Sequence, residues 1–311
     1  MTTEAPRSRD ARALAQRAMV ALFWELRDTS IRPIVLGGLV PEVLAGADRE
    51  EAPDHMGTND VDLLVAFHVD DSSHRPANGE SDVAKTGGGD EADDDGNHEP
   101  DLGPLEAALK AAGLVPDPKI GGWRWIARVD GYAVKVEFLC DRDDVQDKAV
   151  IRPRGCTNLR FANLRGAGYV ARDFVEENVT DRLPNGTSAT VTVRFAGLQG
   201  YLLAKLAALL DRQLDKDHYD LVYVLLHHKA GTGPRGAADA LLAGPFARDL
   251  PSLRNRFREL AARFSGTHDH GPAAYAKQLT LVYPDADRAT LIQDAISAIQ
   301  EFTAPLIEER R

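Results

Sequence analysis

Hydrophobic and polar positions divide the chain into two halves with different periods. Before residue 196, short apolar runs and alternating apolar and polar residues predict β-strands between a few helices. From residue 197 onward, apolar residues recur at three- and four-residue steps, which is typical of amphipathic helices. The pattern therefore predicts an α+β protein, with a mixed sheet and helices over residues 1–195 and a helical domain over residues 196–311.

The individual elements follow from the same periods and from turn residues. In the first half, helices are predicted over 10–28, 39–45 and 105–112, and strands over 34–36, 60–67, 123–129, 132–139 and 191–195. In the second half, helices are predicted over 197–212, 216–228, 237–242, 253–264 and 287–307. Asp130-Gly131 separates two alternating strands, which is typical of a tight β-hairpin.

One stretch interrupts the first half. Residues 70–101 hold eleven Asp or Glu, two Lys or Arg and almost no large apolar side chains, so they carry −9 of the chain's net charge of −11. Such a segment buries too little apolar surface to offset its ordering entropy, and we expect a disordered acidic insertion. The rest of the chain is close to neutral, so its charge does not exclude an RNA partner.

Composition narrows the class of protein. Hydrophobic residues make up 43% and charged residues 27% of the chain, which is ordinary for a globular protein. No apolar run reaches the roughly 20 residues that span a bilayer, and the first residues lack the apolar core of an export signal. Only two cysteines occur, Cys140 and Cys156, and they form no metal-binding motif. These features predict a cytoplasmic protein without a membrane segment or a zinc site.

A pair of acidic residues stands at the start of the second predicted strand. Asp60 and Asp62 are two residues apart, so on a strand they project from the same face, while Val61 and Leu63 point to the other. Two neighbouring carboxylates repel each other, and a divalent cation removes that repulsion. Because Mg²⁺ prefers oxygen ligands and binds carboxylates together with substrate phosphates, we predict a Mg²⁺ site at this pair.

Glu137 is a candidate third carboxylate. It lies among apolar residues on the strand predicted over 132–139, where a lone charge needs a partner or a metal. Three carboxylates (Asp60, Asp62 and Glu137) can hold two metal ions, which activate an attacking hydroxyl and stabilise a leaving pyrophosphate. The alternative is that Glu137 faces outward on an amphipathic strand.

Gly37-Gly38 lies between a buried strand and the start of a helix. At such a turn, backbone N–H groups and the helix dipole point outward together, which suits an anionic group such as a triphosphate. Glycine also allows phosphates to approach the backbone closely. We therefore expect Gly37 and Gly38 to bind a nucleotide.

Together these residues resemble the nucleotidyltransferase superfamily with a DNA-polymerase-β-like fold. Its pattern is a hydrophobic-Gly-Gly/Ser turn, an acidic-x-acidic strand and a third acidic residue on a later strand; Leu36-Gly37-Gly38, Asp60-Val61-Asp62 and Glu137 match it. Thr58 fits the Thr-x-Asp-x-Asp form of the second motif. The chain departs from the family where Gly38 stands in place of a frequent Ser, and where a common Arg before Thr58 is absent, with His55 nearby.

The helical half resembles a narrower family. Residues 205–226 read KLAALLDRQLDKDHYDLVYVLL, which is similar to the signature of the AbiEii/AbiGii toxins, including MenT-like toxins. In that signature a helical Lys precedes an Arg and an Asp-x-Tyr-Asp-Leu segment, and Lys205, Arg212, Asp217 and Asp220 fall on those positions. On the residues alone, Lys205 and Arg212 share one helix face, Asp217 and Asp220 share a face of the next helix, and a short turn brings the two faces together. A salt-bridge cluster joining the helices is the alternative to a substrate site.

The resemblance implies a Mg²⁺-dependent transfer of a nucleotide from an NTP to an acceptor hydroxyl. Lys205 is then expected to contact the triphosphate, and Asp217 to position Lys205 or to act as a base, while Thr58 and Arg212 help to bind the nucleotide. The implied acceptor is the 3′ end of tRNA, and the protein would be a toxin with a cognate antitoxin. Two alternatives stay open: nucleotidylation of a small molecule such as an antibiotic, and a catalytically inert nucleotide-binding regulatory protein.

Overall fold

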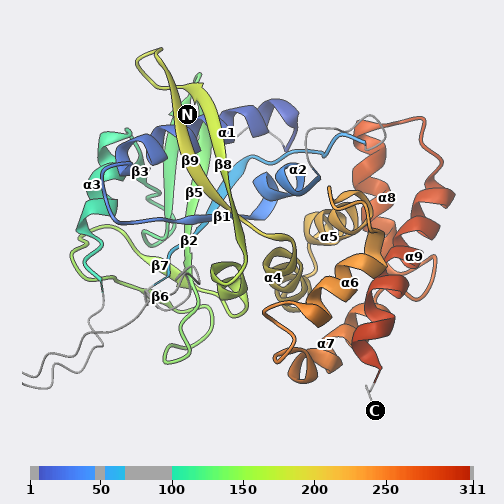
Figure 1. The fold of residues 1–311 in the computed structure, drawn as a ribbon. Coiled ribbons are helices and arrows are strands. Elements are labelled where there is room, and N and C mark those ends of the chain that lie inside the picture. Colours follow the sequence, from blue (N-terminus) through green and yellow to red (C-terminus); the bar gives the residue numbers. More distant parts are fainter. Residues whose placement is uncertain (1–6, 46–52, 67–99, 309–311) are drawn as a thin grey trace, which may run out of the picture.

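The computed structural model describes residues 7–45, 53–66 and 100–308. A mixed sheet with helices comes first in the chain and a helical region follows it, which confirms the predicted α+β class (Figure 1). The helices are α1 (Arg9–Leu26), α2 (Val40–Ala45), α3 (Gly103–Ala111), α4 (Leu198–Asp211), α5 (Asp215–His227), α6 (Gly233–Ala243), α7 (Leu250–Ala262), α8 (His270–Val282) and α9 (Arg288–Ile307). The strands are β1 (Ile34–Leu36), β2 (Asp60–Leu64), β3 (Val115–Pro116), β4 (Arg124–Val129), β5 (Tyr132–Cys140), β6 (Val150–Ile151), β7 (Phe161–Asn163), β8 (Phe174–Arg182) and β9 (Ser188–Ala196).

The strands form one sheet in the order β3-β4-β5-β2-β1-β9-β8, with β7 beside the end of β5 and β6 beside β7. β1 is antiparallel to β2 and parallel to β9, and β2 is parallel to β5. The short strands β1 and β2 therefore lie at the centre of the sheet, between two long hairpins. Alternate residues of β2, Val61 and Leu63, are completely buried, as the period of two requires.

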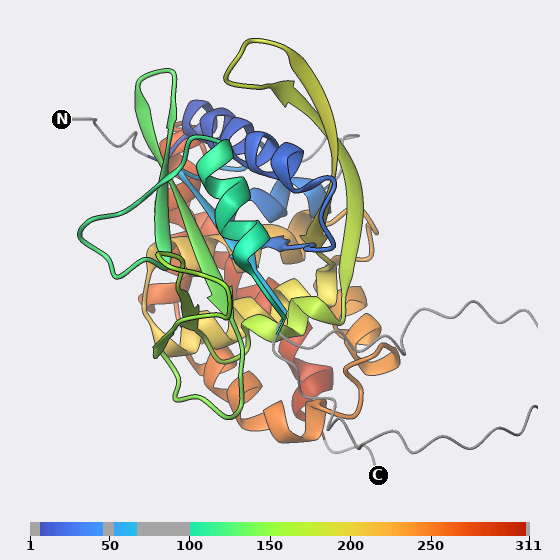
Figure 2. The same ribbon diagram turned by 90° about the vertical axis from the view of Figure 1, so that its left-hand side faces the viewer.

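Helix α1 covers one face of this sheet. The Ser8 hydroxyl caps its first turn by accepting a hydrogen bond from the Ala11 backbone N–H at 3.1 Å. Its apolar stripe, which includes Ala15, Met19 and Leu22, is buried against the strands. Seen from the side, α1 and α3 lie next to each other over the sheet (Figure 2).

Helix α5 is the centre of the helical region. It contacts α2, α4, α6, α8 and α9, and every residue from Asp217 to Leu225 is buried. Tyr219 on α5 stacks on Tyr275 of α8, with ring centroids 5.9 Å apart. Two aspartates thus lie inside a packed helical core, where ionised carboxylates need partners. Within the described ranges, no helix has the length and apolar character needed to cross a membrane.

Several elements were not predicted from the sequence. Strand β8 has a largely polar sequence and lies at the edge of the sheet, where it gains its structure by pairing with β9 along all nine residues. Helix α8 begins with His270-Gly271-Pro272, and Gly and Pro together are more typical of a turn than of a helix, so the sequence did not indicate a helix there. The helix packs between α5 and α9. The short strands β3, β6 and β7 also lacked a local signal. Among the described residues, the last strand ends at Ala196 and the helical region begins with α4 at Leu198, but the division into two domains there stays a prediction.

Two further predictions have different outcomes. Cys140 and Cys156 are buried thiols that form no disulfide among the described residues. The acidic insertion predicted over residues 70–101 lies outside the described residues except for Pro100 and Asp101, which precede α3.

Candidate active site

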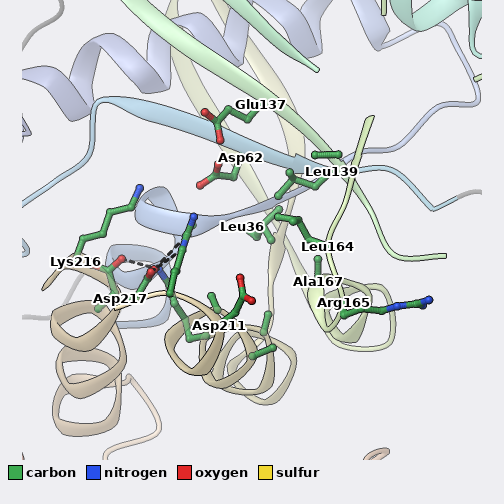
Figure 3. A pocket seen from close by; sticks show the side chains of 18 of the residues that line it. Leu36, Asp62, Glu137, Leu139, Leu164, Arg165, Ala167, Asp211, Lys216 and Asp217 are labelled. Carbon is green, nitrogen blue, oxygen red and sulfur yellow. Dashed lines mark hydrogen bonds and ion pairs between the residues drawn. The ribbon is translucent and has the colours of Figure 1, made fainter. Parts of the chain in front are cut away.

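Asp62 and Glu137 lie side by side on neighbouring strands. In the parallel register of β2 and β5, Asp62 pairs with Glu137 and Asp60 with Lys135. Both carboxylates of the first pair line a cleft of about 510 Å³, and Figure 3 shows them next to each other on its wall. The fold therefore brings the carboxylates of Asp62 and Glu137 next to each other, as a shared site would need.

The electrostatic environments of Asp60 and Asp62 differ. Burial, together with the nearby carboxylates of Asp60 and Glu137, raises the pKa of Asp62 well above its usual value. Burial also opposes ionisation of Asp60, but Lys216, whose Nζ lies 3.1 Å from Oδ2, and a hydrogen bond donated by the Thr58 hydroxyl lower its pKa. Lys216 and Thr58 thus stabilise the negative charge of Asp60, whereas burial and the neighbouring carboxylates disfavour a negative charge on Asp62.

Glu137 has a protein partner as well. Nε of Arg124 donates to its Oε1 at 2.7 Å, and Nη2 forms an ion pair with the same oxygen at 2.6 Å. Arg124 lies directly opposite Glu137 in the β4–β5 hairpin. The sequence contained the signal for this pair, because a two-residue turn at Asp130-Gly131 fixes the register and places residue 124 opposite residue 137.

The three predicted metal ligands do not form a closed cluster. Within residues 7–45, 53–66 and 100–308, no group of three or more His, Cys, Asp or Glu side chains is arranged to hold a metal ion. Asp62 and Glu137 nevertheless offer two adjacent carboxylates at a cleft, and Mg²⁺ commonly takes one or two carboxylates, with phosphate oxygens and waters completing the shell. The donor chemistry of this pair fits one Mg²⁺, and the raised pKa of Asp62 is the energetic reason a cation would bind there.

Gly37 and Gly38 are required by close packing against the acidic strand. Gly37 has φ +76°, and a Cβ added to it would lie 1.9 Å from Oδ2 of Asp62. A Cβ on Gly38 would lie 2.6 Å from both Cβ and Oγ1 of Thr58. The Thr58 side chain therefore occupies the space that a side chain at position 38 would need.

We expect Gly38→Ala to lower the free energy of unfolding by about 1–3 kcal/mol, as overpacking of a filled site does. In a Thr58→Gly background, the same change should be much less harmful, because the clashing atoms are gone. Urea denaturation of the two single variants and the double variant measures the coupling. An equal loss in both backgrounds would contradict the proposed contact between these positions.

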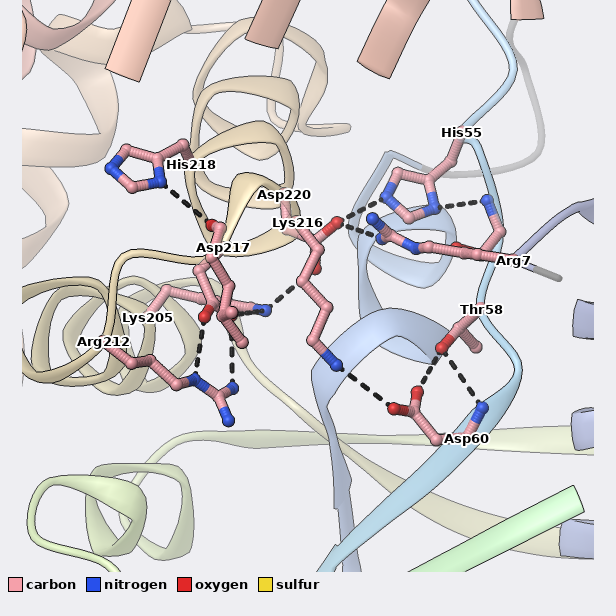
Figure 4. A network of polar contacts seen from close by, with 12 residues as sticks. Arg7, His55, Thr58, Asp60, Lys205, Arg212, Lys216, Asp217, His218 and Asp220 are labelled. Carbon is pink, nitrogen blue, oxygen red and sulfur yellow. Dashed lines mark hydrogen bonds and ion pairs between the residues drawn. The ribbon is translucent and has the colours of Figure 1, made fainter. Parts of the chain in front are cut away.

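Two buried aspartates on α5 organise the cations on the other side of the cleft (Figure 4). Asp220 accepts from Arg7 at 2.5 Å, from Lys205 at 2.8 Å and lies 3.0 Å from Nε2 of His55. Asp217 accepts from Lys205 at 3.1 Å and from Arg212 Nε at 2.9 Å.

These contacts bear on the roles predicted for Lys205 and Asp217. Burial opposes ionisation of Asp217, yet Lys205 and Arg212 lower its pKa, so it is held as an anion by two partners. That arrangement favours positioning over general-base catalysis for Asp217. The Lys205 side chain is only 7% exposed, whereas Lys216 is 33% and Arg212 47% exposed. Of these three cations, Lys216 and Arg212 are thus more open to a ligand in the cleft than Lys205.

Some relations between these residues were missed or wrong. Arg212 does not continue the helix of Lys205: α4 ends at Asp211, and Arg212 is extended, with φ −136° and ψ 142°. The two cations meet because both bind Asp217, not because seven residues bring them to one helix face. Arg7 and Lys216 were not predicted at all, since only the tertiary structure brings them to Asp220 and Asp60.

Known proteins give no independent guide to this site. No family model matches the chain, and neither a curated protein nor a solved structure matches it. The chemical interpretation therefore rests on the geometry, burial and charge of the residues described above.

Proposed function

We propose that this protein is a Mg²⁺-dependent nucleotidyltransferase with a nucleotidyltransferase fold, which transfers a nucleotide from an NTP to an acceptor hydroxyl. One observation carries the proposal: paired carboxylates, Asp62 and Glu137, line a cleft together with cationic side chains and the positive-φ turn at Gly37. A cleft of about 510 Å³ is within the range of small-ligand sites. Carboxylates next to cations and a glycine turn are what a magnesium–triphosphate complex requires.

Each group has a role in binding the triphosphate. When bound at Asp62 and Glu137, Mg²⁺ would supply positive charge that neutralises the carboxylates and the phosphate oxygens. Lys216 and Arg212 contact phosphate oxygens, and their aspartate partners, Asp60 and Asp217, fix the orientation of these two cations. Lys205 lies deeper and holds the two aspartates of α5 in place. Catalysis is then mostly a matter of positioning and charge neutralisation, as in phosphoryl transfer generally.

The proposed acceptor is the 3′ end of tRNA, and the proposed biological role is that of a cytoplasmic toxin with a cognate antitoxin. This part rests on the resemblance of residues 205–226 to the AbiEii/AbiGii signature, whose four matching residues take part in one ion-pair network. Glu137 lies beside Asp62 instead of turning away from it, which favours an enzyme over an inert nucleotide-binding protein.

The test is incubation of the full chain with each labelled NTP, Mg²⁺ and total tRNA. We expect label on tRNA from one NTP, dependence on Mg²⁺, and loss of the signal in Asp60→Ala, which removes the anchor of Lys216. Glu176→Ala is the matched control, since Glu176 forms an exposed ion pair with Arg194 on the β8–β9 hairpin, and it should transfer label normally.

The outcomes separate the candidate functions. Label on tRNA in the wild-type protein and in Glu176→Ala, but not in Asp60→Ala, supports the proposal. NTP binding without transfer to any RNA would remove tRNA as the acceptor, and transfer to aminoglycoside-like hydroxylated compounds would then point to the small-molecule alternative.

A further inference from the structure

Two buried polar groups in the wall of the cleft make no hydrogen bond in the ion-pair network described above. The Tyr201 side chain on α4 is 1% exposed, and its hydroxyl has no hydrogen-bond partner among the described residues. Nη1 of Arg7 is likewise buried and unpaired within the part of the chain that the structure covers. Both residues line the same cleft as Asp62 and Lys205. Buried donors without partners are uncommon in folded proteins and point to a ligand or a structural role.

Around Asp217 and Asp220, hydrogen-bond donors outnumber the acceptors that are still open. The carboxylates of α5 are already engaged, Asp220 by three partners and Asp217 by two. Lys205 uses two of its three ammonium protons on them. Arg7 donates from Nε to the Gly57 carbonyl at 2.5 Å and from Nη2 to Asp220. Arg7, Tyr201 and Lys205 each keep a hydrogen-bond donor that no acceptor in this network uses. A ligand that bonds to these donors therefore has to offer an acceptor oxygen.

Lys205 connects the other two donor residues, because it shares the Asp220 carboxylate with Arg7 and lies over the Tyr201 ring. Nζ of Lys205 lies 5.6 Å from the centre of the Tyr201 ring. Burial raises the pKa of Tyr201 well above its usual value, and the charges of Asp220, Arg7 and Asp62 also act on it, so the hydroxyl keeps its proton and can donate. Arg7 in turn is near enough to Asp60 to lower the pKa of that carboxylate.

We propose that the Tyr201 hydroxyl and the Arg7 guanidinium, together with Lys205, form an oxyanion subsite that binds an oxygen of the NTP triphosphate. The inference rests on the proposed function and extends it, because it assigns two residues outside the recognised motifs to phosphate binding. The anionic oxygens of a triphosphate are acceptors that suit these unpaired donors, and hydrogen bonds to a charged acceptor are the stronger kind.

Removal of the Tyr201 hydroxyl has effects of opposite sign with and without ligand. In the ligand-free protein, Tyr201→Phe deletes an unpaired buried polar atom and keeps the ring, so the melting temperature should stay the same or rise. Binding of inorganic triphosphate in the presence of Mg²⁺ should weaken about 10- to 100-fold, the size expected for one hydrogen bond to a charged group. A merely structural hydroxyl would lower the melting temperature and leave binding unchanged.

Tyr223→Phe is the matched control. Tyr223 is also fully buried, but its hydroxyl donates to the Pro53 carbonyl at 2.9 Å, away from the cleft. This variant should melt at a lower temperature and bind triphosphate like the wild type. Arg7→Lys is the second test variant: it keeps a cation for Asp220 and removes Nη1, so it too should bind triphosphate more weakly.

Calorimetric titration of inorganic triphosphate and of tRNA, with thermal melting of the same variants, completes the test. Weaker triphosphate binding in Tyr201→Phe and Arg7→Lys, with tRNA binding unchanged, supports the subsite. Wild-type affinity for triphosphate in Tyr201→Phe, a loss confined to tRNA, or no triphosphate binding by the wild-type protein would overturn it. If triphosphate binds as expected but no NTP yields transfer, the subsite stands and the proposed reaction falls.

Discussion

Asp62→Asn should abolish nucleotidyl transfer and at the same time stabilise the metal-free protein. We expect transfer to fall by a factor of about 1,000 or more, because one of the two adjacent carboxylates that suit Mg²⁺ is lost. Near neutral pH, the free energy of unfolding should rise by about 1–3 kcal/mol, because the variant removes a buried charge that Asp60 and Glu137 repel.

The pH dependence gives the sign of this effect. The pKa of Asp62 in the folded protein lies well above its usual value of 3.8, so the unfolded chain releases this proton at lower pH than the folded chain does. The carboxylate therefore destabilises the fold above pH 3.8, increasingly up to its folded pKa, and has no such effect in more acidic solution. Denaturation of wild type and variant across this range should show the advantage of Asp62→Asn disappearing as the pH falls below 3.8.

Asp60→Asn is the control for this prediction. Asp60 is held by Lys216 and Thr58, so its loss should destabilise the fold even though it also removes a carboxylate from the same strand face. Mg²⁺ should raise the melting temperature of the wild type and have little effect on Asp62→Asn. A destabilised Asp62→Asn protein, or one with full transfer activity, would contradict the assignment of the carboxylate pair.

Asp220→Asn should cause the largest loss of stability among these substitutions, about 3–5 kcal/mol in the free energy of unfolding. The change leaves the buried cations Arg7 and Lys205 without their shared anion and weakens the contact with His55. Since Arg7 also bonds the Gly57 carbonyl, the start of α1 and the loop before β2 should loosen together. Urea denaturation measures the loss, and hydrogen exchange around Gly57 should become faster.

The sign of the pH effect is opposite to that of Asp62. Burial opposes ionisation of Asp220, but Arg7, Lys205 and His55 set its pKa well below the usual 3.8. Its contribution is therefore fully present above pH 3.8 and is lost as the pH falls toward the folded value. Glu176→Gln, which breaks an exposed ion pair 2.9 Å long, is the control and should change stability by no more than about 1 kcal/mol. An equal loss of unfolding free energy in Asp220→Asn and Glu176→Gln would contradict the prediction, because the buried network would then stabilise the fold no more than an exposed ion pair does.

Local patterns were sufficient to predict the parts of the site that a single strand or turn contains. Alternation along one strand puts Asp60 and Asp62 on the same face whatever the strand pairs with. The Asp130-Gly131 turn fixes the hairpin register in the same way, and the helical period predicts α4 and α5. These features depend on residues a few positions apart, so the sequence holds all the information that they need.

The partners of the charged residues depend on contacts between distant segments. Asp62 meets Glu137 only through the parallel pairing of β2 with β5, and Lys216 reaches Asp60 across 156 positions. Arg7 reaches Asp220 across 213 positions. No local period predicts such pairs, because they arise from the pairing of distant strands and from the packing of the helical region against the first half of the chain.

The sequence by itself determined the α+β class, the acidic pair and the glycine turn, since each follows from the short-range geometry of strands, turns and helices. Only the tertiary structure decided the electrostatic environments of Asp60, Asp62 and Asp220: Asp60 and Asp220 have cationic partners from remote segments, whereas the charge on Asp62 is opposed by burial and by its acidic neighbours. The physical reason is that a carboxylate's pKa depends on its depth and on all charges within a few ångströms, most of which belong to remote parts of the chain.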